Sequence, residues 1–223
     1  MNHRQSVQKG GFGQVYKGNS KDGGAVAVKR LHLQAKDFAH RELDIAGYFV
    51  GKDANHIIPY LDTGRDADSD DYFVVMSLAD KSLDDLVDSL GHLDEIQSVE
   101  ISLQIVGGLI EAGDLVHRDL KPGNILLHQG LWKIADFGIA KFVEDATSED
   151  TLRGFRSPQY AAPEQWRGER PTHKTDVYAL GCILYKMLTG QPPFPGPRVE
   201  DYQKQHLENA PNPVPNIRSE LAS

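Results

Sequence analysis

Residues 116–124 carry the side chains best suited to chemistry in this sequence. They read VHRDLKPGN, so one carboxylate, three basic side chains and one amide lie close together and end in a Pro-Gly turn. This composition is poorly suited to a packed helix or strand, whereas loops on a rigid scaffold often carry such groups for catalysis. The stretch therefore predicts a catalytic loop.

A short β-hairpin is predicted directly after this loop. Apolar runs at 125–127 and 131–135 flank a turn that contains a glycine, as in two paired strands. The hairpin separates Asp119 and Asn124 on one side from Asp136 on the other. Because carboxylate and amide oxygens suit Mg²⁺, a hard cation, the arrangement indicates magnesium-bound phosphate chemistry.

Three motifs in order carry a resemblance to a known family. The run HRDLKPGN at 117–124, then DFG at 136–138 and APE at 162–164, resembles the catalytic domain of eukaryotic-type (Hanks-type) serine/threonine protein kinases. The resemblance covers nearly the whole chain and is greatest to bacterial Ser/Thr kinases.

The resemblance implies an α+β, two-lobed protein-kinase fold. A small lobe with an antiparallel sheet and one main helix would bind the nucleotide, and a larger, mostly helical lobe would carry the catalytic loop. The expected divisions are an N-lobe at 1–76, a hinge at 77–80 and a C-lobe at 81–223, within one kinase domain.

The resemblance also implies an activity, namely ATP- and Mg²⁺-dependent transfer of the γ-phosphoryl group to Ser or Thr hydroxyls of proteins in signalling. Asp119 would accept or orient the proton of the attacking hydroxyl. Lys121 would balance charge on the phosphoryl group, and its position resembles the Ser/Thr-specific branch. Asn124 and Asp136 would hold Mg²⁺, and Lys29 would contact the α- and β-phosphates.

The nucleotide site is expected to begin with the glycine-rich segment at 8–18. Gly10, Gly11 and Gly13 would let backbone N–H groups approach phosphate oxygens, although a plain β-hairpin could use the same glycines for its turn. Gln8 stands where the family usually has its first glycine. The resemblance assigns further ATP contacts to Val15, Ala27, Met76, Leu78, Ala79 and Leu126.

A helix over residues 35–50 is predicted from apolar residues at helical spacing. Glu42 lies in this apolar stripe, and a carboxylate there needs a partner, for which Lys29 is the natural choice. Asp44 is the alternative to Glu42 as the carboxylate that pairs with Lys29, but Asp44 falls on the polar side of the helix.

Two long helices are predicted in the second lobe. The first has apolar residues at spacing 3-4-3-4 that should pack on the core: Ile96, Val99, Leu103, Val106 and Ile110. It also contains Gly107 and Gly108, each costing about 1 kcal/mol relative to alanine. The second helix spans 173–188 and ends at Gly190. Asp176 would support the backbone of the catalytic loop, or would be an exposed aspartate favoured by the helix dipole.

Residues 136–164 are the expected activation segment. Its polar middle, 143–152, should be a mobile loop with candidate phosphosites at Thr147, Ser148 and Thr151, whose phosphate Arg118 could pair with. A second kinase molecule would be the partner for trans-autophosphorylation. Ser157, with Tyr160 beside it, would line the pocket for the protein acceptor.

Bulk composition excludes several function classes. The 223 residues are 39% hydrophobic and 25% charged, with a net charge of −8, which gives nucleic-acid binding no electrostatic support. Cys182 is the one cysteine, so no internal disulfide forms and a cytoplasmic location is expected. No stretch reaches membrane-spanning length.

The C-terminal part departs from the family. Seven of the twelve prolines lie between Pro192 and Pro215, which leaves room for one short helix near 199–207. We expect the family's last helices to be missing, Glu164 to lack a distal arginine partner, and the large lobe to expose an apolar face. Two other functions stay open: a non-catalytic scaffold with a kinase fold, and a small-molecule phosphotransferase.

Overall fold

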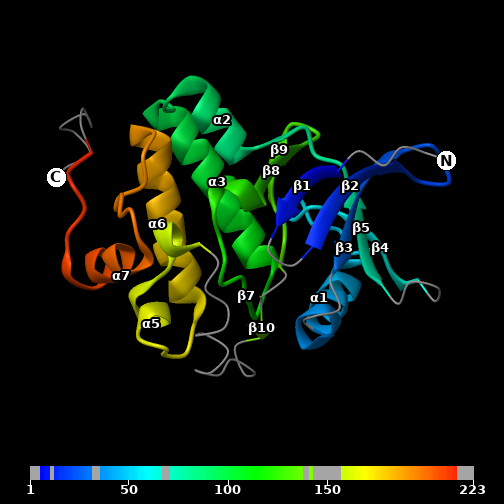
Figure 1. Ribbon diagram of the computed structural model, residues 1–223. Coiled ribbons are helices and arrows are strands. Elements are labelled where there is room, and N and C mark those ends of the chain that lie inside the picture. The colour runs from blue at the N-terminus through cyan, green and yellow to red at the C-terminus, as the bar shows by residue number, and fades with distance from the viewer. Residues whose placement is uncertain are drawn as a thin grey trace.

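The fold is α+β with two lobes, as expected (Figure 1). A computed structural model describes residues 6–10, 13–31, 36–66, 71–137, 141–142 and 157–214. A sheet with one helix forms the small lobe, and most helices gather in the large lobe on the other side. The boundaries 1–76, 77–80 and 81–223 remain predictions.

The small lobe is one antiparallel sheet with strands in the order β1-β2-β3-β5-β4. Their bounds are Ser6–Gly10 (β1), Gly13–Asn19 (β2), Ala25–Leu31 (β3), Tyr60–Arg65 (β4) and Tyr72–Ser77 (β5). In β3 the side chains of Ala27, Lys29 and Leu31 are buried, while Val28 and Arg30 on the other face are only half-buried. The alternation follows from the two-residue period of a strand. Lys29 therefore points to the inner face of the sheet.

Helix α1 (Lys36–Phe49) covers part of that inner face, where it packs against β4 and β5. Its buried residues include Glu42, Ile45, Ala46 and Phe49, at helical spacing. The predicted helix over 35–50 is therefore confirmed within one residue at each end. It brings a carboxylate onto the same face as Lys29.

The apolar residues between His56 and Leu61 predict a short strand there from the sequence, but the strand begins later, because β4 spans Tyr60–Arg65. Ile57 instead forms an isolated bridge with Ile134, and the Ile58 N–H donates to the Ile134 carbonyl at 2.9 Å. The apolar residues before Pro59 are thus used to join the two lobes. The position of the strand was wrong because hydrophobicity alone does not say which partner a segment pairs with.

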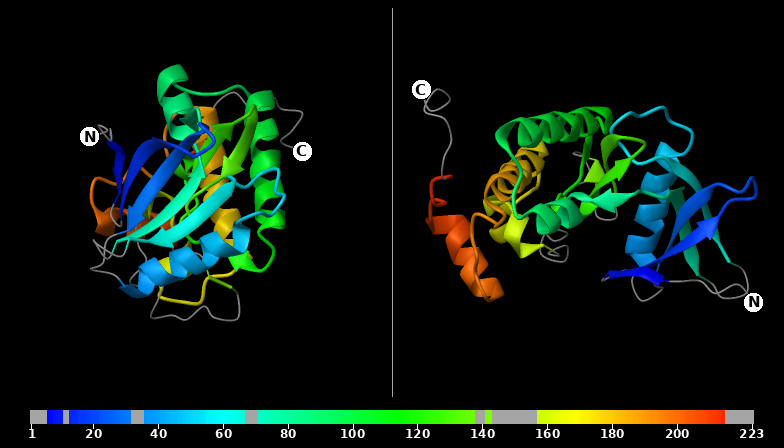
Figure 2. Two further views of the ribbon diagram at one scale, coloured as in Figure 1. Left: turned by 90° about the vertical axis from the view of Figure 1, so that its right-hand side faces the viewer. Right: turned by 90° about the horizontal axis from the view of Figure 1, so that it is seen from above.

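The large lobe is built around helices α2 (Leu83–Leu90), α3 (Glu95–Glu111) and α6 (His173–Thr189). Further elements complete it: β6 (Lys81–Ser82), β7 (Leu115–Val116), η2 (Pro122–Asn124), β8 (Ile125–His128), β9 (Leu131–Ile134), β10 (Lys141–Phe142), η4 (Pro158–Tyr160), α5 (Pro163–Trp166) and α7 (Val199–Glu208). Helix α3 packs against α6 and β9, and the side views place it along the outer edge of the lobe (Figure 2).

Local sequence signals explain where the helices begin and end. At α2, Ser82 accepts from the Asp85 N–H while the Asp85 carboxylate accepts from the Ser82 N–H, which is a capping box. Thr172 caps α6, and Gly190 ends it in the left-handed region with φ 76°. The predicted end of this helix at Gly190 is confirmed, as is a short helix near 199–207. Within the described residues, every helix is too short or too polar to span a bilayer.

The predicted hairpin is confirmed. Strands β8 and β9 pair antiparallel, with Ile125 opposite Ile134 and His128 opposite Leu131. The two turn residues have positive φ, 51° at Gln129 and 77° at Gly130, as a tight two-residue hairpin turn requires. The catalytic loop thus ends where β8 begins, and Asp136 lies just past the end of β9.

The apolar stripe of α3 lies on the surface, so the prediction that it packs on the core was wrong. Its exposed residues are Ile96, Val99, Leu103, Val106 and Ile110. The buried face instead carries Ser98, Ile101, Ile105 and Gly108. A 3-4 spacing identifies an apolar face but not what covers it, and α3 is apolar on two sides. The expected exposed apolar face of the large lobe is therefore present on α3.

The glycine pair in α3 is explained by close packing. A Cβ on Gly107 would lie 2.7 Å from the His56 ring, and a Cβ on Gly108 would lie 2.5 Å from the His56 carbonyl oxygen. Ile134 also approaches Gly108 at 2.9 Å. The two glycines lower the helix propensity of α3, but they allow the segment before β4 to lie directly on the helix.

Candidate active site

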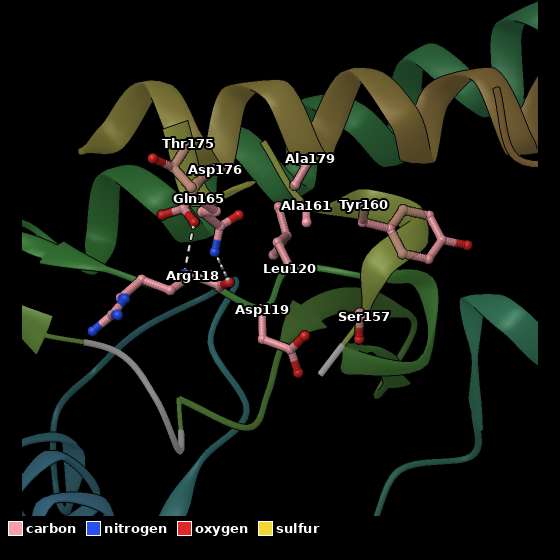
Figure 3. Close-up of a pocket in the computed structure, with 10 residues that line it drawn as sticks. All are labelled: Arg118, Asp119, Leu120, Ser157, Tyr160, Ala161, Gln165, Thr175, Asp176 and Ala179. Atoms are coloured by element: carbon pink, nitrogen blue, oxygen red, sulfur yellow. Dashed lines mark hydrogen bonds between the residues drawn. The ribbon is translucent and has the colours of Figure 1, made fainter. Parts of the chain in front are cut away.

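The catalytic loop is held by a buried carboxylate from α6. Asp176, which is 2% exposed, accepts a hydrogen bond from the backbone N–H group of His117 at 2.8 Å. It accepts a second from the N–H group of Arg118 at 2.9 Å (Figure 3). Arg118 has φ 69°, a conformation that non-glycine residues rarely adopt and that surrounding contacts must hold. The prediction that Asp176 supports this loop is confirmed, and the exposed-aspartate alternative is wrong.

The charge state of Asp176 reflects opposing influences. Burial raises the pKa of its carboxyl group, while His117 and the two backbone N–H groups lower that pKa.

The carbonyl of Arg118 accepts from Gln165 Nε2 at 2.9 Å, so α5 holds the same peptide from the other side. Sequence reasoning missed Gln165, because only the fold brings this side chain to the loop.

His117 connects the loop to the segment after β9. Its Nε2 lies 3.1 Å from the Ala135 carbonyl oxygen and its Nδ1 accepts from the Asp119 N–H at 3.3 Å, which assigns the proton to Nε2. The ring also packs on Phe137, with 4.7 Å between centroids, and Phe137 packs on Phe49 of α1 at 5.0 Å. These contacts link the catalytic loop, Asp136 and α1.

Asp119, Lys121 and Ser157 form a second small cluster. Lys121 Nζ lies 2.9 Å from Asp119 Oδ2 and donates to Ser157 Oγ at 3.0 Å. In Figure 3 the Asp119 carboxylate points away from α6, on the side of the loop opposite Asp176. Asn124 Nδ2 donates to the Asp119 carbonyl at 2.9 Å. The backbone of Asp119 is thus fixed while its side chain points away from α6.

Lys29 joins the two lobes through two carboxylates. Its Nζ lies 2.5 Å from Glu42 Oε1 and 2.6 Å from Asp136 Oδ1. The predicted ion pair with Glu42 is confirmed, whereas Asp44 is exposed and plays no part in it. Asp136 has φ 60°, a second left-handed residue at the site. Two strained residues, one at each end of the loop and hairpin unit, are typical of functional sites.

The electrostatics of Lys29 favour a charged ammonium group. Burial alone lowers the pKa of Lys29, but the carboxylates of Asp136 and Glu42 outweigh burial and raise the pKa above its ordinary value. The Lys29 side chain is 8% exposed and that of Glu42 is 9% exposed, while that of Asp136 is 34% exposed. Asp136 is therefore the member of this trio with oxygen surface left for another ligand.

The residues expected to contact a nucleotide lie on the inner side of the sheet and at the connection between the lobes. Val15 pairs with Lys29 across β2 and β3, and Ala27 pairs with Met76 across β3 and β5. Leu126 lies on β8, beneath them in the large lobe. All of these apolar residues belong to the core or pack against it.

The hinge residues follow β5. The Leu78 carbonyl oxygen is 3.1 Å from His128 Nδ1, and the Asp80 N–H donates to the Leu127 carbonyl at 2.8 Å, so β8 holds the connection. Ala79 lies between these two anchored residues. Gly10 pairs with Gly13 at the tip of the β1–β2 hairpin.

Several predicted residues lie outside the described ones. They are Gly11, Gly138 and the candidate phosphosites Thr147, Ser148 and Thr151, together with the rest of the expected mobile loop at 143–152.

Two polar contacts were not expected from the sequence. Asp71 is the last of four aspartates between residues 66 and 71, and such a run is usually a solvated turn, yet Asp71 is 6% exposed and pairs with Arg30 at 2.6 Å. Glu164 accepts from the Thr175 hydroxyl at 2.6 Å. In both cases the partner comes from another element, so spacing along the chain carried no signal. Cys182 is buried, and burial raises the pKa of its thiol to about 12, which makes the thiol unreactive.

Fold and site together define a class of protein. A sheet lobe and a helical lobe meet at a buried lysine that is bound by two carboxylates. Beside it lies a loop with one left-handed residue, Arg118, and this loop carries an aspartate, a lysine and an asparagine. This is the architecture of two-lobed kinases.

Comparison with known proteins identifies the family. The family model for the protein kinase domain matches residues 1–220 of this sequence, so the chain belongs to the protein kinase family. It is 35% identical to a probable serine/threonine-protein kinase of Corynebacterium efficiens, over 97% of this chain and 35% of the relative. It is 35% identical to the serine/threonine-protein kinase PknD of Mycobacterium tuberculosis, over 92% of this chain and 32% of the relative.

A third relative is the serine/threonine-protein kinase PrkC of Bacillus subtilis, 36% identical over 82% of this chain and 29% of the relative. The chain thus spans about a third of the length of the curated relatives that it matches.

Proposed function

We propose that this chain is the catalytic domain of an ATP- and Mg²⁺-dependent serine/threonine protein kinase that acts on protein hydroxyls in signalling. The observation that carries the proposal is a pair of side-chain clusters on two segments that lie side by side, because the Ala135 N–H, next to Asp136, donates to the Asn124 carbonyl at the end of the catalytic loop at 2.8 Å. Lys29 with Glu42 and Asp136 forms one, and Asp119 with Lys121 and its hydrogen-bonded Ser157 forms the other. A second kinase molecule as a partner for trans-autophosphorylation and the cytoplasmic location stay predictions.

Phosphoryl transfer depends mainly on positioning and on neutralising charge, so each group has a definite task. Asp119 orients the acceptor hydroxyl and receives its proton, and Lys121 stabilises charge on the phosphoryl oxygens. The 2.9 Å contact between these two side chains supports the assignment of both tasks to neighbouring groups. Ser157, bound to the same lysine, marks the side from which a Ser or Thr acceptor approaches.

Asn124 and Asp136 would hold the Mg²⁺ ion. Their oxygen donors fit a hard cation, and Asp136 keeps a third of its side chain exposed although one oxygen binds Lys29. When bound, Mg²⁺ neutralises phosphate charge and fixes the triphosphate. Lys29 binds the α- and β-phosphates, and Glu42 holds the lysine in place.

The remaining nucleotide contacts follow from the position of the sheet. Val15, Ala27, Met76 and Leu126 supply apolar surface for the adenine ring, and backbone groups of Leu78 and Ala79 bind its edge. Gly10, Gly11 and Gly13 cover the phosphates. Gln8 stands where the family usually has its first glycine, and this position is where the nucleotide site departs from the family.

Transfer of labelled phosphate tests the proposal. Labelled ATP and Mg²⁺ are offered with protein acceptors and, separately, with small-molecule alcohols, to the wild type and to Asp119→Asn. We expect transfer to protein Ser and Thr, reduced about 10²- to 10⁴-fold by the substitution, since a positioned proton acceptor contributes that much. Asp114→Asn is the matched control, because Asp114 is an exposed aspartate close by in sequence.

Each outcome separates the competing functions. Transfer that Asp119→Asn leaves unchanged refutes the catalytic assignment. Nucleotide binding without transfer to any acceptor favours a scaffold with a kinase fold. Transfer to small alcohols alone favours a small-molecule phosphotransferase.

A further inference from the structure

His128, the last residue of β8, contacts the hinge (residues 77–80) through its side chain. The residue is half-buried, and its Nδ1 lies 3.1 Å from the carbonyl oxygen of Leu78. A carbonyl oxygen only accepts hydrogen bonds, so the proton of this contact is on Nδ1. The neutral imidazole with its proton on Nδ1 and the charged imidazolium can both donate this bond.

The turn of the β8–β9 hairpin fixes the position of the imidazole ring. His128 pairs with Leu131, and the two residues between them, Gln129 and Gly130, have φ values of 51° and 77°. A two-residue turn of this kind sets the register of the strands that it joins. The ring is therefore presented to the hinge by a paired strand and not by an irregular loop.

Backbone hydrogen bonds hold the hinge at two neighbouring points. The Ser77 N–H donates to the Pro59 carbonyl at 2.9 Å, and the Asp80 N–H donates to the Leu127 carbonyl at 2.8 Å. The bond from His128 lies between these two points. It therefore acts on the part of the hinge whose backbone groups are proposed to bind the adenine edge.

Strand β8 also leads to the metal end of the proposed nucleotide site. Leu126 and His128 lie on the same face of β8, because side chains alternate along a strand. Leu126 is proposed to contact the adenine ring, and Asn124, which is proposed to hold Mg²⁺, directly precedes the strand. At about 3.3 Å per residue, the step from Asn124 to His128 is roughly 13 Å.

We propose that His128 is a positioning residue for the nucleotide. Its hydrogen bond to Leu78 holds the adenine-binding backbone of the hinge at a fixed distance from the metal ligand at the other end of β8. The inference rests on the proposed kinase function and deepens it. Because His128 is far from Asp119 along β8 and has no part in phosphoryl transfer, loss of its donor should weaken nucleotide binding and leave kcat unchanged.

Three substitutions separate the hydrogen bond from the shape of the side chain. His128→Leu removes the donor and keeps a side chain of similar bulk. His128→Asn keeps a donor nitrogen as many bonds from the backbone as Nδ1, whereas His128→Gln places the donor one bond further out. His92→Leu is the matched control, because His92 is an exposed histidine outside the hinge.

Nucleotide affinity and transfer are measured separately. The first is the Kd of ADP with Mg²⁺ by calorimetry, and the second is the steady-state kinetics of transfer from ATP to a serine peptide. We expect His128→Leu and His128→Gln to raise the Kd of ADP and the KM for ATP about threefold to tenfold, the range for one lost hydrogen bond. The kcat and the KM for the peptide should change by less than about twofold, and His128→Asn and His92→Leu should resemble the wild type.

The outcomes distinguish this inference from the kinase assignment. Unchanged nucleotide constants in His128→Leu overturn the inference and leave the assignment intact. Equal losses in His128→Asn and His128→Leu also overturn it, because the donor would then not matter. Changes in kcat and in the KM for the peptide as large as that for ATP overturn it as well, since general loss of structure would explain them.

If His128→Leu fails to fold, the comparison of His128→Gln with His128→Asn makes the same test. A wild type that binds ADP but transfers no phosphate overturns the kinase assignment, and the Kd of ADP in the variants then decides the role of His128. A wild type that binds no nucleotide overturns both.

Discussion

Lys29 is a cation with almost no contact with water, and two carboxylates from different elements hold it. A buried charge of this kind costs several kcal/mol to desolvate unless its partners are well placed. Removing one partner is therefore more costly than removing an exposed charge. Glu42 comes from α1 and Asp136 from the large lobe, so the position of Lys29 depends on how the two lobes pack against each other.

Replacing Glu42 tests this at the level of one residue. In Glu42→Gln the lysine keeps only Asp136, is drawn toward the large lobe and misplaces the phosphates. We expect kcat/KM for phosphate transfer to fall about 10- to 100-fold, since small misplacements have effects of that order. Steady-state kinetics with varied ATP measure the change.

Asp44→Asn is the control for this variant, because it makes the same change of charge on the same helix at an exposed position. It should alter kcat/KM by less than about twofold. Equal effects of the two substitutions would contradict the assignment of Glu42.

At the scale of elements, α3 packs closely against the segment before β4, and this contact helps to join the two lobes. Glu111 at the end of α3 accepts from the backbone N–H groups of Asn55 (3.1 Å) and His56 (2.8 Å). Lys133 of β9 also binds the carbonyl of Asn55. These contacts require Gly107 and Gly108 at the point of closest approach.

Gly108→Ala should destabilise the protein although alanine favours a helix. Its Cβ would lie 2.5 Å from a backbone oxygen that cannot rotate away, so the helix or the segment must shift. We expect a net loss of about 1–3 kcal/mol, as for other overpacked sites. Chemical denaturation measures it. Gly47→Ala in α1 is the control, because its Cβ meets nothing within 4 Å; it should stabilise by up to about 1 kcal/mol.

Helix α7 is seated through His206, which is 5% exposed. Its Nδ1 lies 2.8 Å from the Tyr178 hydroxyl, and its ring packs on those of Phe194, Tyr178 and Trp166 at 4.7, 5.7 and 6.2 Å. Burial lowers the pKa of His206 to about 4, although nearby carbonyls of η4 oppose the shift. The imidazole is therefore neutral in the folded protein.

This predicts a pH dependence with a definite sign. Between about pH 6.5 and pH 4 the unfolded chain binds a proton that folded His206 does not, so stability is full above pH 6.5 and falls as the pH is lowered. Between pH 7 and pH 5 the loss from this group is roughly 2 kcal/mol. Urea denaturation of the wild type and of His206→Gln measures it. The variant should be less stable at pH 7 but should show a shallower pH slope, and identical slopes would contradict the assignment.

At the scale of the whole molecule, the exposed face of α3 departs from an ordinary protein surface, because it carries five large apolar side chains. Exposed fractions reach 72% at Ile96, 65% at Leu103 and 74% at Ile110. Contiguous apolar surface of this kind promotes association. Because these side chains are already in water, they contribute little to the stability of the isolated chain.

Polar replacement separates these two effects. We expect Ile96→Gln/Leu103→Gln/Ile110→Gln to reduce concentration-dependent self-association, seen by sedimentation velocity, while the free energy of unfolding changes by no more than about 0.5 kcal/mol per site. The matched control is Ile101→Gln on the buried face of α3, which should unfold the chain. A large loss of stability in the triple variant would mean that the exposed face is covered in solution.

The sequence alone determined the family, the fold class, the hairpin after the catalytic loop, the helix over 35–50 and the Lys29–Glu42 pair. Each of these rests on local spacing, such as apolar periodicity or a run of polar residues in a loop, and local spacing is visible in one chain. Asp176 could be proposed as the support of the catalytic loop only because the motifs already indicated which loop it would face.

Tertiary structure decided the rest. Only the structure shows that the apolar stripe of α3 faces solvent and that β4 begins at Tyr60. Only the structure shows that Asp71 pairs with Arg30 and that Glu164 accepts a hydrogen bond from Thr175. It also placed Asp84 and Lys186 beside the catalytic lysine. Periodicity shows that a face is apolar, and composition shows that a residue is charged. Which other element meets that face or charge depends on the packing of segments far apart in the chain, and this is a property of the fold as a whole.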